Sequence, residues 1–285
     1  MTVLEELFKT VDELRKYVPS VESNVSFAEL NSSATSARKQ IIVVLSGPVY
    51  SNVLKDTGEK HAALLSAMGN LTLAKQLIFD VINRRKADIE VYKYELEAMR
   101  RSYIENYYNG MDTLIQLLDE DKSEENKWKE SRYYKLLDSL KIKDTESFDF
   151  LYPIDLSYLF FFRIIPLQKE VLDEGMKGYF DRASDNQDAI NMLLRALSKM
   201  TVAIALRRFD ILEFPSTIRN LFEDSKTSRS GRDEQNRMLS LSNQLSTEVQ
   251  SLLKDVDLIL SSNDSGAIDT ESSFNTSEDK IILMP

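Results

Sequence analysis

Two stretches of this chain, residues 64–77 and 193–206, carry nearly the same series of residues at a constant separation. The first series is Leu64, Leu65, Ala67, Met68, Leu71, Thr72, Leu73, Ala74 and Leu77, and the second is Leu193, Leu194, Ala196, Leu197, Met200, Thr201, Val202, Ala203 and Leu206. In both stretches the apolar spacing is that of an amphipathic helix. The match predicts two similar helical halves that arose by internal duplication. Chance similarity between helices rich in Leu and Ala is the alternative explanation.

The similarity extends on both sides of the matched helices. Upstream, the corresponding residues are Ile42, Val43 and Tyr50 in the first half and Val171, Leu172 and Tyr179 in the second. Downstream, residues 84–92 resemble residues 207–214 once a small deletion is allowed. Residues 88–92 and 210–214 both combine an Asp with apolar residues, and Pro215 favours an extended residue before it. The sequence therefore allows one short two-stranded β pair in an otherwise all-α fold.

Composition supports a mostly helical protein. The 285 residues include 8 Gly and 6 Pro, while 42% of them are hydrophobic and 29% are charged. Helix interiors exclude Gly and Pro, so their scarcity favours helices over turns and strands. The chain has no cysteine, which excludes disulfides and thiolate metal ligands and indicates a protein made in a reducing cytoplasm.

Apolar periodicity and helix-breaking residues predict a bundle of about eight or nine helices. The expected helices cover residues 3–17, 27–45, 58–83, 96–118, 128–140, 157–177, 185–208, 216–224 and 232–260. We expect Pro166 to kink or divide one of them, and residues 141–153 to form an irregular connection. The predicted organisation is an N-terminal half (1–150), a C-terminal half packed on it (151–262) and a flexible acidic arm (263–285).

The arm combines a polar stretch with an apolar tip. Residues 261–279 are mainly Ser, Asn, Asp, Gly, Thr and Glu, which bury too little apolar surface to order themselves. The tip carries Ile281, Ile282, Leu283 and Met284, four apolar residues that are costly to leave in water. We expect these four residues to contact a partner subunit, and folding back onto the same chain is the alternative.

No group of residues in the sequence specifies a reaction. His61 is the single histidine, so a metal site built from His and Cys ligands is excluded, and glycine-rich nucleotide loops and the esterase serine elbow are absent. We therefore expect no catalytic residues, no cofactor and no metal. The longest apolar segment we single out, residues 156–167, is interrupted by Arg163 and Pro166, and we expect no membrane partner.

The formal net charge of −10 argues against tight binding to nucleic acid. Two basic doublets stand out against this charge, Arg84 with Arg85 and Arg207 with Arg208. They are candidates for contact with DNA or with an acidic partner. Pairing with local carboxylates is the ordinary alternative for such doublets.

A family resemblance rests on aromatic and proline positions between residues 128 and 166. They are Trp128, Ser131, Tyr134, Phe148-Asp149-Phe150, Tyr152-Pro153-Ile154, Ser157, Phe161 and Ile165-Pro166. In this order the chain resembles a helical protein family of phages and prophages of gut Bacteroidetes, whose genes are often found among head and neck genes. The resemblance covers most of the predicted body and does not cover the arm.

The resemblance implies a structural virion protein, similar to head-to-tail connector or neck adaptor subunits. Such a protein forms a homo-oligomeric ring between the portal and the tail, contacts both, and lets DNA pass with at most non-specific contact. It would be made in the bacterial host cytoplasm and reside in the virion neck. An assembly chaperone or scaffold of a phage or prophage is the alternative, and an enzyme with a carboxylate-dependent site is a third possibility.

Overall fold

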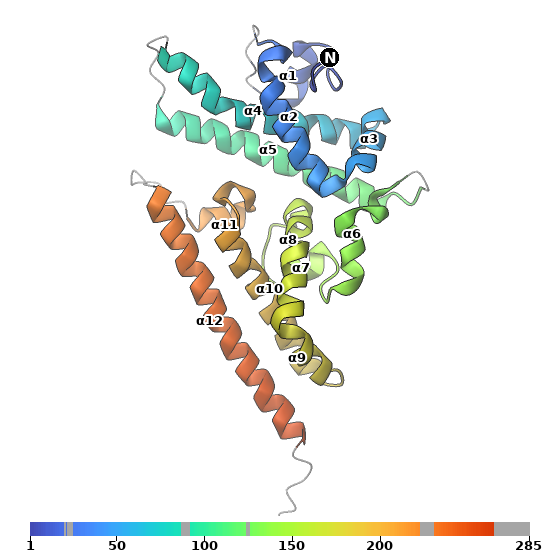
Figure 1. Ribbon diagram of the computed structural model, residues 1–285, viewed down its shortest axis with the longest axis vertical. Helices are drawn as coiled ribbons and strands as arrows, with labels where there is room; N and C mark the ends of the chain where they lie inside the picture. Colours follow the sequence, from blue (N-terminus) through green and yellow to red (C-terminus); the bar gives the residue numbers. More distant parts are fainter. Residues whose placement is uncertain (20, 22–24, 87–91, 124–125, 223–230, 265–285) are drawn as a thin grey trace, which may run out of the picture.

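The computed structural model describes residues 1–19, 21, 25–86, 92–123, 126–222 and 231–264, and at 81–86, 93–94, 231–233 and 262–264 it defines the backbone alone. All regular secondary structure in these ranges is helical, which confirms the predicted all-α fold (Figure 1). The apolar tip, residues 281–284, lies outside the described residues, as do residues 88–91 of the predicted β pair.

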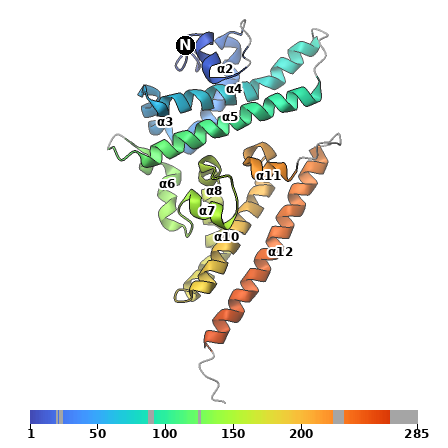
Figure 2. The ribbon, with the colours of Figure 1, turned by 180° about the vertical axis from the view of Figure 1, so that it is seen from behind.

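The helices form two packs, one above the other in the view of Figure 1. The upper pack contains α1 (Val11–Tyr17), α2 (Phe27–Leu45), α3 (Gly47–Lys55), α4 (Glu59–Lys86) and α5 (Lys93–Glu120). The lower pack contains α6 (Arg132–Leu136), α7 (Thr145–Leu151), α8 (Tyr158–Val171), α9 (Lys177–Arg182), α10 (Gln187–Arg208), α11 (Ser216–Asn220) and α12 (Gly231–Asp264). The packs meet mainly where α8 contacts α5 (Figures 1 and 2).

The two matched stretches occupy equivalent places in the two packs. Helix α4 packs most extensively on α5 and then on α2, and α10 packs most extensively on α12 and then on α8. In each pack a short helix, α3 or α9, precedes the central one. The matched residues Thr72 and Thr201 are both fully buried, and each donates its hydroxyl to a carbonyl four residues earlier at 2.7 Å. This correspondence agrees with the predicted duplication.

Local sequence explains where several helices begin. Ser26 accepts a hydrogen bond from the Glu29 amide, and the Glu29 carboxylate accepts one from the Ser26 amide, so a capping box starts α2. At the turn from α2 to α3, Ser46 has a φ of 77° and Pro48 occupies the first turn of α3. Residues 27–45 were predicted as a helix with these same bounds.

The upper pack depends on a close approach of α4 and α5. A Cβ atom placed on Gly110 of α5 would lie 2.9 Å from the backbone nitrogen of Ala67 and 3.1 Å from the carbonyl oxygen of Ala63. Because both neighbouring atoms belong to the backbone of α4, only a residue without a side chain allows this separation. Gly110 therefore sets the distance between the two helices.

Several predicted elements differ from the structure. Residues 3–7 form turns that bury Val3, Leu4 and Leu7, so the first α-helix begins only at Val11. The predicted helix 128–140 is three short pieces, because 3₁₀-helices at Trp128–Glu130 and Leu137–Ser139 flank α6. The predicted irregular connection 141–153 contains α7, which the Asp144 side chain caps by accepting the Ser147 amide.

The predicted β pair and the predicted division at Pro166 are also wrong. The described residues contain no strand, and Ile211–Glu213 is a 3₁₀-helix whose start is capped by Asp210. Helix α8 continues past Pro166 to Val171, and the irregularity follows later as a π-helical turn, Leu172–Met176. At the start of the arm, the backbone remains helical to Asp264.

The predicted connection, residues 141–153, and the segment before it from Trp128 pack on helices of the lower pack. We had assigned residues up to 150 to the N-terminal half. Helices α6 and α7 contact α8, and α7 also contacts α10. Trp128 is 0% exposed, and its ring centroid lies 4.7 Å from that of Phe162 in α8. This buried indole anchors the connection to the lower pack.

Two segments are long and apolar enough to cross a membrane by length and composition alone, Glu59–Asp80 and Gln187–Arg208. Neither segment was predicted as a membrane span. They form most of α4 and all of α10, the central helices of the two packs, and most of each segment is buried against neighbouring helices. The buried core helices of a protein that does not cross a membrane can have the same length and apolar composition as membrane spans.

Candidate functional site

A cleft of about 740 Å³ lies between α2, α4 and α5 of the upper pack and α8 and the Ile211–Glu213 turn of the lower pack. We call it the seam cleft. Its walls combine hydroxyl and amide groups, cations and apolar side chains, including Ser32, Ser36, Gln40, Leu71, Lys75, Leu77, Ile78, Phe79, Arg100, Ile104, Tyr108 and Arg163. It is the larger of the two cavities described below, and residues far apart in the sequence form it.

Two cations in the seam cleft make no ion pair with any described residue. Lys75 on α4 is half-buried, and Arg100 lines the same cleft from α5. Burial lowers the pKa of the Lys75 ammonium, the negative charge of Glu213 opposes this shift, and Arg100 adds to it. Arg163, Asp210 and Glu213 also line the cleft, so its described lining carries three cations and two carboxylates and has an excess of one positive charge.

A third cation, Arg163 of α8, is already paired. Its guanidinium donates to the Glu213 carboxylate at 2.9 Å, and its Cζ lies 4.8 Å from the centre of the Phe209 ring. Although burial opposes the charged form, Glu213 is the leading cause that raises the Arg163 pKa. This pair fastens the Ile211–Glu213 turn to α8 and closes one side of the cleft.

Tyr108 lies between the seam cleft and a second pocket. The side chain is buried, its hydroxyl has no hydrogen-bond partner among the described residues, and burial raises its pKa. The second pocket has a volume of about 360 Å³, and its lining includes Glu105, Asp112, Asp155 and Arg219. The Tyr108 hydroxyl is thus a buried polar group without a described partner, placed between the two cavities.

The carboxyl group of Asp112, on α5, accepts hydrogen bonds from residues at the start of α8. Its Oδ1 accepts hydrogen bonds from the Leu159 amide at 2.7 Å and from the Ser157 hydroxyl at 3.1 Å. Burial raises its pKa to about 7, the hydrogen bonds from Leu159 and Ser157 oppose the shift, and the nearby charge of Asp155 adds to it. Asp112 therefore joins the two packs through a carboxyl group that titrates near neutral pH.

Asp155 and Arg219 complete the walls of the second pocket. Asp155 accepts hydrogen bonds from the Thr217 amide at 2.8 Å and the Ser216 hydroxyl at 2.6 Å, and so caps α11. The buried Arg219 has one terminal nitrogen 3.6 Å from Glu105 and the other without a partner among the described residues. These contacts hold α5, α8 and α11 together.

Buried acids of raised pKa are the expected mark of the third possibility, an enzyme with a carboxylate-dependent site. A carboxylate-dependent enzyme would place two or more buried acids of raised pKa in one pocket. Asp112 is the one described carboxyl group whose pKa is raised. No group of three or more His, Cys, Asp or Glu side chains in the described ranges could hold a metal ion.

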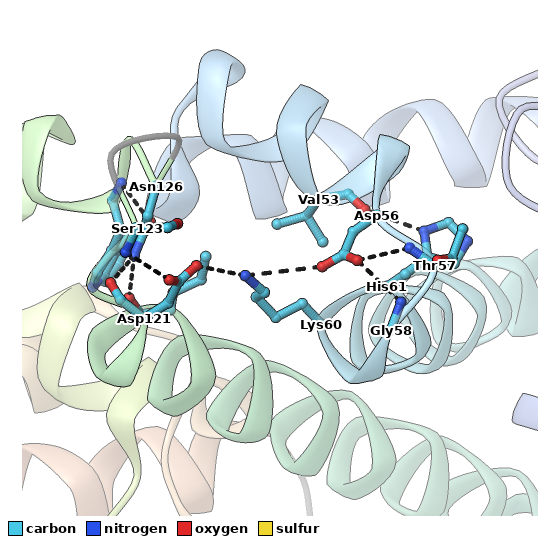
Figure 3. A network of polar contacts seen from close by, with 11 residues as sticks. Val53, Asp56, Thr57, Gly58, Lys60, His61, Asp121, Ser123 and Asn126 are labelled. Atoms are coloured by element: carbon cyan, nitrogen blue, oxygen red, sulfur yellow. Dashed lines mark hydrogen bonds and ion pairs between the residues drawn. The ribbon is translucent and has the colours of Figure 1, made fainter.

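His61 belongs to a network that joins the start of α4 to the end of α5 (Figure 3). Its Nδ1 lies 3.2 Å from the Val53 carbonyl oxygen. The Lys60 ammonium lies 2.6 Å from Asp121 and 3.9 Å from Asp56, and the hydrogen bond from Lys60 is the leading cause that lowers the Asp121 pKa to about 2. These contacts place His61 in the structure that links α3, α4 and the end of α5.

The described basic doublet is engaged within the chain. Arg207 donates to the Ser242 hydroxyl at 2.8 Å and the Asn243 side-chain oxygen at 3.2 Å, both on α12. Arg208 makes two hydrogen bonds of 2.6 Å to the Glu170 carboxylate on α8. These contacts match the alternative stated for this doublet, pairing with groups of the same chain instead of contact with DNA or an acidic partner. Arg84 and Arg85 fall in the last turn of α4, where the side chains lie outside the described residues.

Sequence reasoning did not identify the seam cleft or Asp112. The cleft residues come from five elements far apart in the sequence, and no local pattern brings them together. Asp112 sits in a helical run of aromatic and aliphatic residues, and a carboxylate on that buried face is the signal that could have found it.

Exposed apolar side chains occur on both packs. Ile78 and Phe79 of α4 are 57% and 48% exposed, Phe150 at the end of α7 is 85% exposed, and Leu258 of α12 is 68% exposed. Helix α4 lies in the upper pack, and the last turns of α12 lie at the opposite end of the molecule (Figures 1 and 2). The protein therefore offers apolar contact points on separate faces.

Comparison of the chain with protein-family models, with curated proteins and with solved structures found no match.

Proposed function

We propose that this protein is a structural subunit of a tailed-phage virion, a head-to-tail connector or neck adaptor that forms a ring between the portal and the tail. The observation that carries the proposal is the placement of exposed apolar side chains on both packs of the helical body. A ring is built from heterologous contacts, in which one face of each subunit meets a different face of its neighbour. A single self-complementary patch would instead favour a closed dimer.

Charge supports the same role. The chain carries a formal charge of −10, and the described basic doublet is held by α12 and by Glu170. An acidic surface repels the DNA backbone, so DNA could pass through a ring of such subunits without being held. The resemblance of residues 128–166 to phage head and neck proteins is the reason for proposing a virion rather than another assembly.

Quantitative mass spectrometry of purified virions tests the proposal. We expect the protein in mature particles at a fixed copy number that matches a single ring, in a constant ratio to the portal protein. Detection in infected cells but not in purified virions would contradict a connector and favour the alternative, an assembly chaperone or scaffold. A copy number that varies between preparations would also contradict a ring.

A further inference from the structure

We propose that the seam cleft is the receptor for residues 278–284 of a neighbouring copy of this chain. The inference rests on the proposed ring, because it says how one subunit holds the next. The cleft is formed by described residues of both packs, and the segment Glu278-Asp279-Lys280-Ile281-Ile282-Leu283-Met284 lies outside them.

Charge complementarity assigns this occupant. Lys75 and Arg100 present two cations without an ion-pair partner among the described residues, in a chain whose net charge is negative. The segment brings two adjacent carboxylates, Glu278 and Asp279, immediately before its apolar residues. An acidic pair followed by an apolar run therefore matches a cleft with cations beside apolar walls.

The apolar part of the cleft also suits the segment. Ile78 and Phe79 line it although each is about half exposed, and Leu71, Leu77 and Ile104 lie on the same walls. An extended peptide points successive side chains to opposite sides, and the cleft is lined from several helices, so neighbouring side chains such as Glu278 and Asp279, and then Ile281 and Ile282, can contact it on different walls. The volume of about 740 Å³ is within the range of about 300–1,000 Å³ that is usual for binding pockets.

Chain length decides between the same copy and a neighbouring one. Helix α12 has 34 residues and is therefore about 51 Å long, and it ends at the far side of the lower pack from the seam (Figure 1). Residues 265–277 span at most about 45 Å when fully extended, which is less than the length of α12. We therefore assign the receptor to a neighbouring copy rather than to the same one.

Cysteine crosslinking in the full-length protein tests the proposal, since the chain has no cysteine of its own. The variant Ser36→Cys/Ile282→Cys places one thiol on an exposed residue of the cleft wall and one in the segment. After treatment with a short bismaleimide, we expect a ladder of covalent multimers in a denaturing gel. The matched control Glu174→Cys/Ile282→Cys places the first thiol on an exposed residue of the π-helical turn, away from the cleft, and should remain monomeric.

A charge reversal makes the test specific. Adding Lys75→Glu and Arg100→Glu should reduce the crosslinked fraction about tenfold, which corresponds to the loss of two modest ion pairs. Adding Glu278→Lys and Asp279→Lys to that variant should restore the crosslinked fraction. Circular dichroism and gel filtration check that each variant keeps its fold.

The proposal is overturned by a crosslinked fraction no higher than that of the control, by crosslinks only within single chains, or by a charge reversal without effect. These outcomes are separate from those that test the virion role. If multimers form through the cleft but the protein is absent from virions, the cleft is a receptor and the connector role is contradicted. If the protein is present in virions but gives no cleft crosslinks, the connector role stands and the cleft is not the receptor.

Discussion

Asp112 makes the stability of this protein depend on pH, and one substitution should remove that dependence. The folded protein raises the pKa of this carboxyl group from 3.8 to about 7, which corresponds to a cost of about 4 kcal/mol for the ionised form. The folded state therefore binds a proton more tightly than the unfolded state does. The stability that the protonated group contributes is complete below pH ~4 and is lost as the pH rises through about 7.

The substitution Asp112→Asn removes the ionisation and retains the side-chain oxygen that accepts from the Leu159 amide and the Ser157 hydroxyl. Relative to the wild type, the variant should gain about 3 kcal/mol of unfolding free energy between pH 5 and pH 8, because most of the titration occurs in that interval. The matched control Asp112→Ala also removes the charge but takes away the oxygen that accepts from the Leu159 amide, so it should be about 1 kcal/mol less stable than Asp112→Asn at every pH.

Urea unfolding followed by circular dichroism at several pH values between 5 and 8 measures these differences. If the wild type and Asp112→Asn show parallel pH profiles, the buried carboxyl group does not titrate near neutrality and the reasoning fails. A wild type that becomes more stable relative to Asp112→Asn as the pH rises would reverse the sign and equally refute it.

Other substitutions test the packing. Gly110→Ala should cost about 1–3 kcal/mol, because the added methyl group meets the α4 backbone at Ala67, and thermal unfolding unchanged from the wild type would contradict that close approach. Trp128→Ala should cost about 3–5 kcal/mol by emptying a fully buried site beside Phe162, which denaturant unfolding would detect. Arg207→Ala should cost about 1 kcal/mol and speed amide hydrogen exchange in α12 around Ser242, whereas unchanged exchange would mean that this contact does not hold the helix.

Long amphipathic helices with clear ends were predictable. Helix α2 has the predicted bounds because Ser26 and Glu29 start it and Gly47-Pro48 follow it, so all the determinants are local. The matched central helices, α4 and α10, were located within a few residues for the same reason, since the periodicity of each is continuous.

The failures arose where tertiary contacts decide between similar local conformations. Residues 3–7 carry apolar residues at helical spacing, yet they form turns that bury Val3 and Leu4 against the upper pack. Alternating apolar residues in 210–214 suggested a strand, but Asp210 caps a 3₁₀-helix that Arg163 then holds through Glu213. A side chain on another element cannot be inferred from local periodicity.

The candidate site was beyond prediction for a related reason. Lys75 and Arg100 lie on helices whose sequences match a simple amphipathic pattern, and only the packing of α4 on α5 beside α8 places both in one cleft. The sequence could not indicate which faces remain open after the two packs meet.

Cryo-electron microscopy of the virion neck tests the connector role most directly. We expect a closed ring between portal and tail into which the helices α2–α5 and α8–α12 fit as described. We also expect density from a neighbouring subunit in the seam cleft. A neck reconstruction whose density is fully explained by other proteins would contradict the connector role.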